Sequence, residues 1–192
     1  MNYPLPPGLG NIQPGDIGNL HTDTPFGRAM GHSPDGKLYH QLTGDDPTLC
    51  PSHSIMFIPD GNGNLCVGDV TFPVAIWMPM AVFEANIQSG HYQAVRLLRV
   101  TNSDVDQRTA MAKYWNDNIH NSFYDIFAYP KLVLTEEFGW QFADPVGYTC
   151  FHYCTEGNAD SVNSVIPGTY PVNPRPVTEI VLLSQGKLQE IT

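Results

Sequence analysis

The clearest alternation of hydrophobic and polar positions lies between residues 54 and 70. Two short apolar runs, 54–58 and 65–70, flank the turn-forming segment PDGNGN at 59–64. Proline, glycine, asparagine and aspartate between two short apolar runs are typical of a β-hairpin. If the turn centres on Gly61, residues that face each other across the hairpin have numbers that add up to 122.

This register places a histidine opposite an acid at the open end of the hairpin. Because side chains alternate between the two faces of a strand, odd-numbered positions from 53 to 57 and from 65 to 69 share one face. That face is apolar except at His53 and Asp69, whose Cβ atoms would lie about 5 Å apart. A carboxylate beside an imidazole fixes its tautomer and stabilises its protonated form. Alternatively, both residues are solvated strand ends, and a register change of one residue would separate them.

The rest of the chain predicts short elements with irregular connections. Residues 1–14 are proline-rich and are expected to form an extended lead-in, and the segment 21–51 a long loop region or a loosely built helix. An apolar stripe predicts a helix from an N-cap at Ser103 to about Asn118. The stripe consists of Met111, Trp115 and Ile119. Further expected elements are a strand within PGDIGNL (14–20), a helix or irregular stretch through 78–87, a strand at 94–100, partly helical structure at 124–134, a loop at 135–149, a short helix from Cys150 and a last strand at 178–184.

Composition indicates a β-containing globular fold. The 192 residues suffice for one domain with a substantial core, and 11% aromatic residues argue against disorder. Seventeen prolines and seventeen glycines in a chain with only 15% charged residues predict many turns and few long solvated helices. We therefore expect a single domain over residues 1–192.

The charge balance excludes several classes of partner. A net charge of −10 with nine Lys and Arg residues argues against binding to nucleic acid and to anionic lipid. No apolar run approaches the roughly 20 residues of a transmembrane helix, and the first residues lack the features of a secretory signal. The expected location is the cytoplasm, or a virion or lysate if the protein is encoded by a phage.

Two of the four cysteines, Cys150 and Cys154, are spaced one helical turn apart. With only four unevenly spaced cysteines, reduced thiols are expected rather than a disulfide framework. If a helix begins at Cys150, its thiol feels the positive end of the helix dipole and lies near free backbone N–H groups, which favour a thiolate. Cys154 would then face the core. Alternatively, both cysteines are buried small hydrophobic residues.

Cys150, His53 and Asp69 together supply a thiol nucleophile, a base and an orienting acid. Five segments that include them carry a resemblance to a known superfamily: IQPGDIGNL (12–20), CPSHSIMFI (50–58), NLCVGDV (64–70), SFYDIF (122–127) and GYTCFHYC (147–154). These segments, across residues 12–158, resemble the NlpC-type papain-like cysteine peptidases and amidases. The order histidine, acid, cysteine is similar to the circularly permuted branch, typified by lecithin:retinol acyltransferase.

The resemblance implies an α+β fold in which an antiparallel, barrel-like sheet packs against helices. It implies Cys150 as nucleophile, His53 as general base and Asp69 as orienting acid, with no cofactor. Cys154 is the alternative nucleophile because CTEG at 154–157 is closer than Cys150-Phe151-His152 to the branch pattern of a small polar residue followed by an acid. The candidate cleft residues are Tyr148, Trp140 and Asp16, although Asp16 also fits a turn-capping role.

The implied reaction is hydrolysis of an amide through a thioester, with a peptide or peptidoglycan-type substrate such as a cell-wall stem peptide. One alternative is a lipid-directed acyltransferase or thioesterase with the same three residues. Another is a papain-like module without catalytic activity, serving as a structural or binding component of a phage or secreted assembly. Metal binding is a further alternative, because CPSH at 50–53 has a spacing found in zinc sites, but no second suitable pair follows it.

Overall fold

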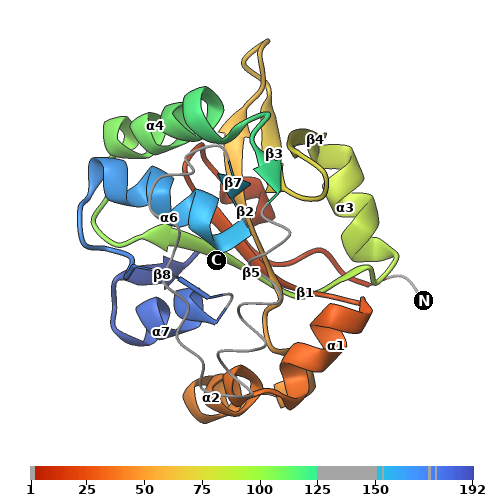
Figure 1. Cartoon of the computed structure of the whole chain (residues 1–192). Helices are drawn as coiled ribbons and strands as arrows, with labels where there is room; N and C mark the ends of the chain where they lie inside the picture. Colours follow the sequence, from red (N-terminus) through yellow and green to blue (C-terminus); the bar gives the residue numbers. More distant parts are fainter. Residues whose placement is uncertain (1–2, 125–150, 153, 173, 176) are drawn as a thin grey trace.

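A six-stranded antiparallel sheet forms the centre of the molecule, which has an α+β fold (Figure 1). This computed structural model describes residues 3–124, 151–152, 154–172, 174–175 and 177–192. The sheet order is β4-β3-β2-β1-β5-β8, so that β4 and β8 are its edges. The strands are β1 (Ile17–Thr22), β2 (His53–Pro59), β3 (Leu65–Val70), β4 (Ala75–Pro79), β5 (Tyr92–Val100) and β8 (Leu188–Glu190).

Helices pack on both faces of the sheet and beyond its lower end in the view of Figure 1. The α-helices are α1 (Pro25–His32), α2 (Pro34–Thr43), α3 (Met80–Gln88), α4 (Val105–Tyr114), α6 (Cys154–Val165) and α7 (Thr178–Ser184). Shorter elements are η1 (Leu9–Asn11), η2 (Pro47–Leu49), the π-helical turn η3 (Trp115–Ile119), and the parallel pair β6 (Phe123–Tyr124) and β7 (Phe151–His152). In the described part of the chain, no helix is long and apolar enough to cross a membrane.

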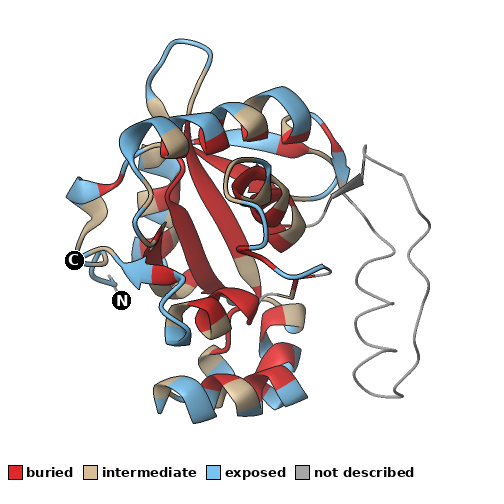
Figure 2. Cartoon of the chain, turned by 90° about the vertical axis from the view of Figure 1, so that its left-hand side faces the viewer, coloured by how far each residue is buried: buried red, intermediate tan, exposed pale blue. Residues whose placement is uncertain are grey.

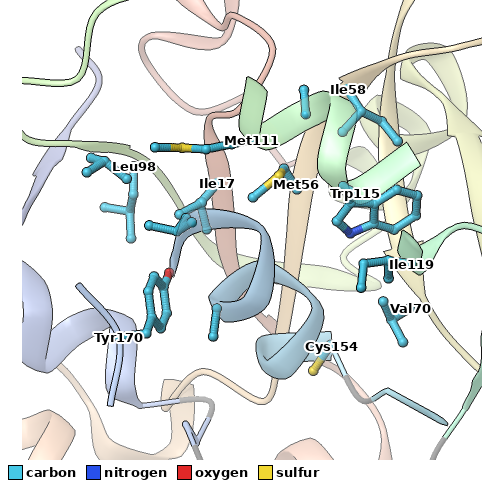
Figure 3. Packing of buried hydrophobic residues seen from close by; sticks show 14 of the residues in the cluster. Ile17, Met56, Ile58, Val70, Leu98, Met111, Trp115, Ile119, Cys154 and Tyr170 are labelled. Carbon is cyan, nitrogen blue, oxygen red and sulfur yellow. The ribbon is translucent and has the colours of Figure 1, made fainter. Parts of the chain in front are cut away.

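The sheet separates two hydrophobic clusters because its central strands are buried on both faces (Figure 2). One cluster joins the sheet to α4, η3 and α6, and its largest side chain is the fully buried Trp115 (Figure 3). The predicted stripe Met111, Trp115 and Ile119 is confirmed as wholly buried here. The second cluster joins the opposite face to α3 through Phe83 and Ile87.

The segment 21–51 is predicted as a long loop region or a loosely built helix, and the structure shows it to be largely helical, with α1, α2 and η2. Thr24 caps α1 by accepting a hydrogen bond from the backbone N–H of Gly27, and proline follows the cap. Ser33 caps α2 in the same way, again with proline at the first helical position. The capping signals at Thr24-Pro25 and Ser33-Pro34 were present in the sequence, but the glycine, proline and histidine content of the segment favours a loop.

Two other predictions need correction, and one observed strand was not predicted. The segment 178–184 is the helix α7 rather than a strand, and Ile180 and Leu182 are buried together with Glu179. The N-cap of α4 is Asp104, which forms a capping box with Gln107, and not Ser103. A strand, β4, precedes α3 and was not predicted. The expected partly helical and loop segments over 125–149 lie outside the described residues.

Candidate active site

The predicted hairpin is confirmed as β2 and β3, but its register differs from the prediction by two residues. Phe57 faces Val67 and Pro59 faces Leu65, so that partner numbers add up to 124 instead of 122. The turn centres one residue later because Asp60 accepts hydrogen bonds from the N–H groups of two following residues, and the left-handed position falls on Gly63. A shift of two residues preserves the face of every side chain.

His53 and Asp69 therefore remain on one face of the hairpin, as diagonal rather than directly opposite neighbours. Their side chains meet: Nε2 of His53 lies 2.8 Å from Oδ1 of Asp69. The histidine side chain is 15% exposed and the aspartate 7%. Diagonal neighbours across an antiparallel pair are within reach of such side chains. The predicted pairing of a histidine with an acid is thus present at the end of the sheet.

The third group at this site is the thiol of Cys154. Burial alone would lower the pKa of His53, but the carboxylate of Asp69 and the thiol of Cys154 raise it well above the ordinary value of 6.5, through charge and hydrogen bonding. The imidazole therefore interacts with an acid and a thiol at the same time. These two groups therefore stabilise the protonated imidazole relative to the neutral one.

Cys154 is the first residue of α6, which contradicts the prediction that this helix begins at Cys150. Phe151 and His152 belong to the strand β7, so the helix starts after them. Cys150 itself lies outside the described residues. Cys154 was expected to face the core, and it is indeed only 5% exposed, but its thiol also lies at the helix end that meets His53. Figure 3 shows its sulfur pointing away from Trp115 and Ile119.

The start of α6 offers further chemistry to the thiol. The first N–H groups of a helix have no partner inside the helix and carry partial positive charge. They can stabilise a thiolate or an oxyanion at this position. The hydroxyl of the buried Thr155 lies 3.9 Å from the Cys154 sulfur. The sequence signal for this arrangement was CTEG, which resembles the branch pattern better than the residues after Cys150.

Small residues let α6 approach the sheet closely. A Cβ atom on Gly157 would lie 3.1 Å from side-chain carbons of both Val70 and Ile119. This tight contact seats the first turn of α6 against β3, the strand that carries Asp69. The same packing fixes how far Cys154 stands from the end of β2.

A buried carboxyl group behind the site was missed by the sequence analysis. Glu179 of α7 has no exposed surface and accepts hydrogen bonds from Asn19 at 2.7 Å and from Ser54 at 2.5 Å. The hydroxyl of Tyr170 donates a further bond at 3.1 Å. Burial raises the pKa of Glu179, although these hydrogen bonds oppose the shift. Nothing in the sequence indicated this role, because the expected strand at 178–184 gave Glu179 no partner.

Of the remaining predicted site residues, only Asp16 is described by the structure, and it does not join the cluster of Cys154, His53 and Asp69. Tyr148 and Trp140 lie outside the described residues. Asp16 is fully buried, accepts a hydrogen bond from the backbone N–H of Gln13, and forms an ion pair with Arg99 at 2.7 Å. It therefore has a turn-capping role, as the alternative interpretation proposed, together with a structural ion pair.

Among the residues that the structure describes, no group of three or more His, Cys, Asp or Glu side chains is arranged to hold a metal ion. No protein-family model matches the chain, and no curated protein sequence matches it. The function must therefore be argued from the geometry of the site.

Proposed function

We propose that this protein is a cysteine-dependent amide hydrolase in which Cys154 is the nucleophile, His53 the general base and Asp69 the orienting acid. The observation that supports the proposal is the position of the His53 imidazole, which is hydrogen-bonded to Asp69 and interacts with the Cys154 thiol at a helix start. The papain-like resemblance supplies the same three roles in the same chain order. It differs in the nucleophile, because Cys154 begins α6 and Cys150 lies outside the described residues.

The proposed reaction has two steps. The Cys154 thiolate attacks the amide carbonyl carbon, a C–S bond forms, and the first N–H groups of α6 bind the developing oxyanion. The C–N bond then breaks as the His53 imidazolium donates its proton to the leaving amine. In the second step, His53 removes a proton from water, the resulting hydroxide attacks the thioester, and the acid is released as the thiol is restored.

Asp69 keeps the imidazole oriented in both steps. With Nε2 of His53 facing Asp69, the Nδ1 atom is left for proton exchange with the thiol, the substrate and water. The proposed substrate is a peptide amide, such as the stem peptide of a bacterial cell wall. A buried thiol beside a charged acid suits a small polar reacting group better than a long acyl chain.

The decisive experiment is labelling of the native protein with iodoacetamide from pH 5 to 9, with peptide mass spectrometry to rank the cysteines. We expect Cys154 to be labelled fastest at pH 6 and His53→Ala to abolish this rapid labelling. Cys66 is the internal control, because burial raises the pKa of its thiol to about 11. Slow labelling of all four cysteines, with no midpoint below the ~8.5 of an ordinary thiol, would contradict the proposal.

The same protein should then be tested against peptide amides and long-chain esters. Hydrolysis of the amides that is lost in Cys154→Ser supports the proposed reaction. Preference for the esters would instead assign the lipid-directed alternative to the same residues. If rapid labelling and turnover depend on Cys150 rather than Cys154, the nucleophile is the one that the sequence first indicated.

A further inference from the structure

The hydrogen bonds of Glu179 connect the two elements that carry the proposed nucleophile and base. The side-chain amide of Asn158, on α6, donates to Oγ of Ser54 at 2.6 Å and to the carbonyl oxygen of Ile55 at 3.1 Å, both on β2. The hydroxyl of Ser54 then donates to Glu179. All three polar side chains are at most 1% exposed.

Each end of this chain of hydrogen bonds adjoins a residue of the site. Ser54 directly follows His53 in β2, and Asn158 lies one helical turn after Cys154 in α6. Residues four apart in a helix lie on the same side, so Asn158 and Cys154 both face the sheet. Any change in the distance between α6 and β2 at Asn158 therefore also changes the distance between Cys154 and His53.

We propose that Glu179 is a positioning residue that holds the thiol of Cys154 in register with the imidazole of His53, through Asn158 and Ser54. This inference rests on the proposed function. A polar link suits this task better than apolar packing because hydrogen bonds are directional and fix one arrangement. Glu179 also accepts a hydrogen bond from Asn19 on β1. In this way α7 connects the two central strands, β1 and β2, with α6.

The donors around Glu179 predict which substitution preserves its role. Ser54, Tyr170 and Asn19 all donate to its two oxygens. Glutamine has nearly the same shape as glutamate and keeps one oxygen that can accept hydrogen bonds from Ser54 and Tyr170. If the Asn19 amide rotates, its oxygen can accept a hydrogen bond from the new N–H group of the glutamine. Glu179→Gln should therefore retain positioning, whereas Glu179→Ala removes the acceptor and leaves buried donors without a partner.

The test measures the pH profile of Cys154 labelling by iodoacetamide in the full-length variants, together with their unfolding in urea. In Glu179→Ala we expect the labelling midpoint to move towards that of an ordinary thiol and the rate at pH 6 to fall at least about tenfold. Glu179→Gln should restore the wild-type profile. Asn158→Ala removes the direct link between α6 and β2 and should reproduce the loss, which provides a second test if Glu179→Ala does not fold.

A matched control is Asp35→Asn. Asp35 is another buried acid, 1% exposed, and it pairs with Arg175 at 3.0 Å. We expect this variant to lose stability while keeping the wild-type labelling profile. If Glu179→Ala or Asn158→Ala is destabilised but keeps that profile, the positioning role is wrong and the proposed function stands. If the wild type itself shows the profile of an ordinary thiol, the proposed function fails and the positioning role fails with it.

Discussion

At the scale of single residues, the proposed chemistry depends on the protonation of His53. The net effect of its neighbours raises its pKa, although burial opposes this, because Asp69 and Cys154 stabilise the imidazolium. An imidazolium beside a thiol favours the thiolate, which is the reactive form of cysteine. Asp69 thus influences Cys154 indirectly, through a histidine that both residues share.

Asp69→Asn tests this influence. Asparagine retains the shape but loses the charge, so we expect the pKa of His53 to fall and the rate of Cys154 labelling at pH 6 to drop roughly tenfold. The histidine is followed by NMR titration in a Cys154→Ser background, where the cysteine does not titrate. Asp60→Asn removes a partly exposed charge in the turn at the other end of the same hairpin and should leave both quantities unchanged. An unaltered His53 titration in Asp69→Asn would mean that the carboxylate does not stabilise the imidazolium.

The sequence predicted part of this residue-scale geometry for a definable reason. Alternation along a strand determines which face a side chain takes, so His53 and Asp69 could be placed together even though the register was wrong by two. The proposed nucleophile is different, because it depends on where a helix begins. Cys150 and Cys154 are equally compatible with helical spacing, and the sequence does not show that α6 begins at Cys154.

At the scale of elements, one glycine determines how η3 packs on the sheet. A Cβ atom on Gly68 of β3 would lie 2.8 Å from atoms of both Ile58 and Trp115. Trp115 is fully buried and η3 is a π-helical turn, so the indole has little freedom to move away. The absence of a side chain at Gly68 is thus what allows this helical layer to contact β3.

Gly68→Ala should therefore destabilise the protein by about 1–3 kcal/mol through overpacking. The measurement is the urea dependence of unfolding, followed by the fluorescence of tryptophan. Gly10→Ala is the control, because a Cβ atom there would meet no other atom within 4 Å. A Gly68→Ala variant as stable as the wild type would show that the Trp115 side chain can move away from β3 at little cost in free energy.

Local signals explain which elements could be predicted. The hairpin was predicted, apart from its register, because turn-forming residues separate two apolar runs, and the buried stripe was predicted because Met111, Trp115 and Ile119 recur at helical spacing. By contrast, the sequence of α7 predicts a strand, because seven residues rich in Ile, Val and Leu are compatible with a strand or a short helix. The helical state is accompanied by tertiary contacts that the local sequence does not show. As part of a short helix buried on one side, Glu179 accepts hydrogen bonds from Asn19 and Ser54.

At the scale of the whole molecule, the α+β architecture joins distant parts of the chain at one end of the sheet. β2 and β3 supply His53 and Asp69, and α6, about 100 residues later in the sequence, supplies Cys154. The helix lies against the central strands in Figure 1. Such long-range pairing cannot be read from local patterns, although the resemblance to papain-like enzymes led us to expect a cysteine helix packed on an antiparallel sheet.

Two buried groups with raised pKa values also set how the stability of the whole molecule depends on pH. Folded Glu179 retains its proton above its ordinary value of 4.5, whereas the unfolded chain loses it there. Folded His53 likewise retains its proton above 6.5. In both intervals the native state binds more protons than the unfolded state, so the free energy of unfolding decreases as pH rises. Repulsion within a chain of net charge −10 acts in the same direction.

We therefore expect the urea midpoint of the Cys154→Ser protein to be highest on the acid side of neutrality and to fall steadily towards pH 9. Glu179→Gln should flatten the part of the curve that begins near pH 4.5, and His53→Gln the part that begins near pH 6.5, because each removes one titrating group. A midpoint that rises between pH 5 and 8 would mean that neither group is protonated in the folded state. In that case the imidazolium that the proposed mechanism requires would be absent at neutral pH.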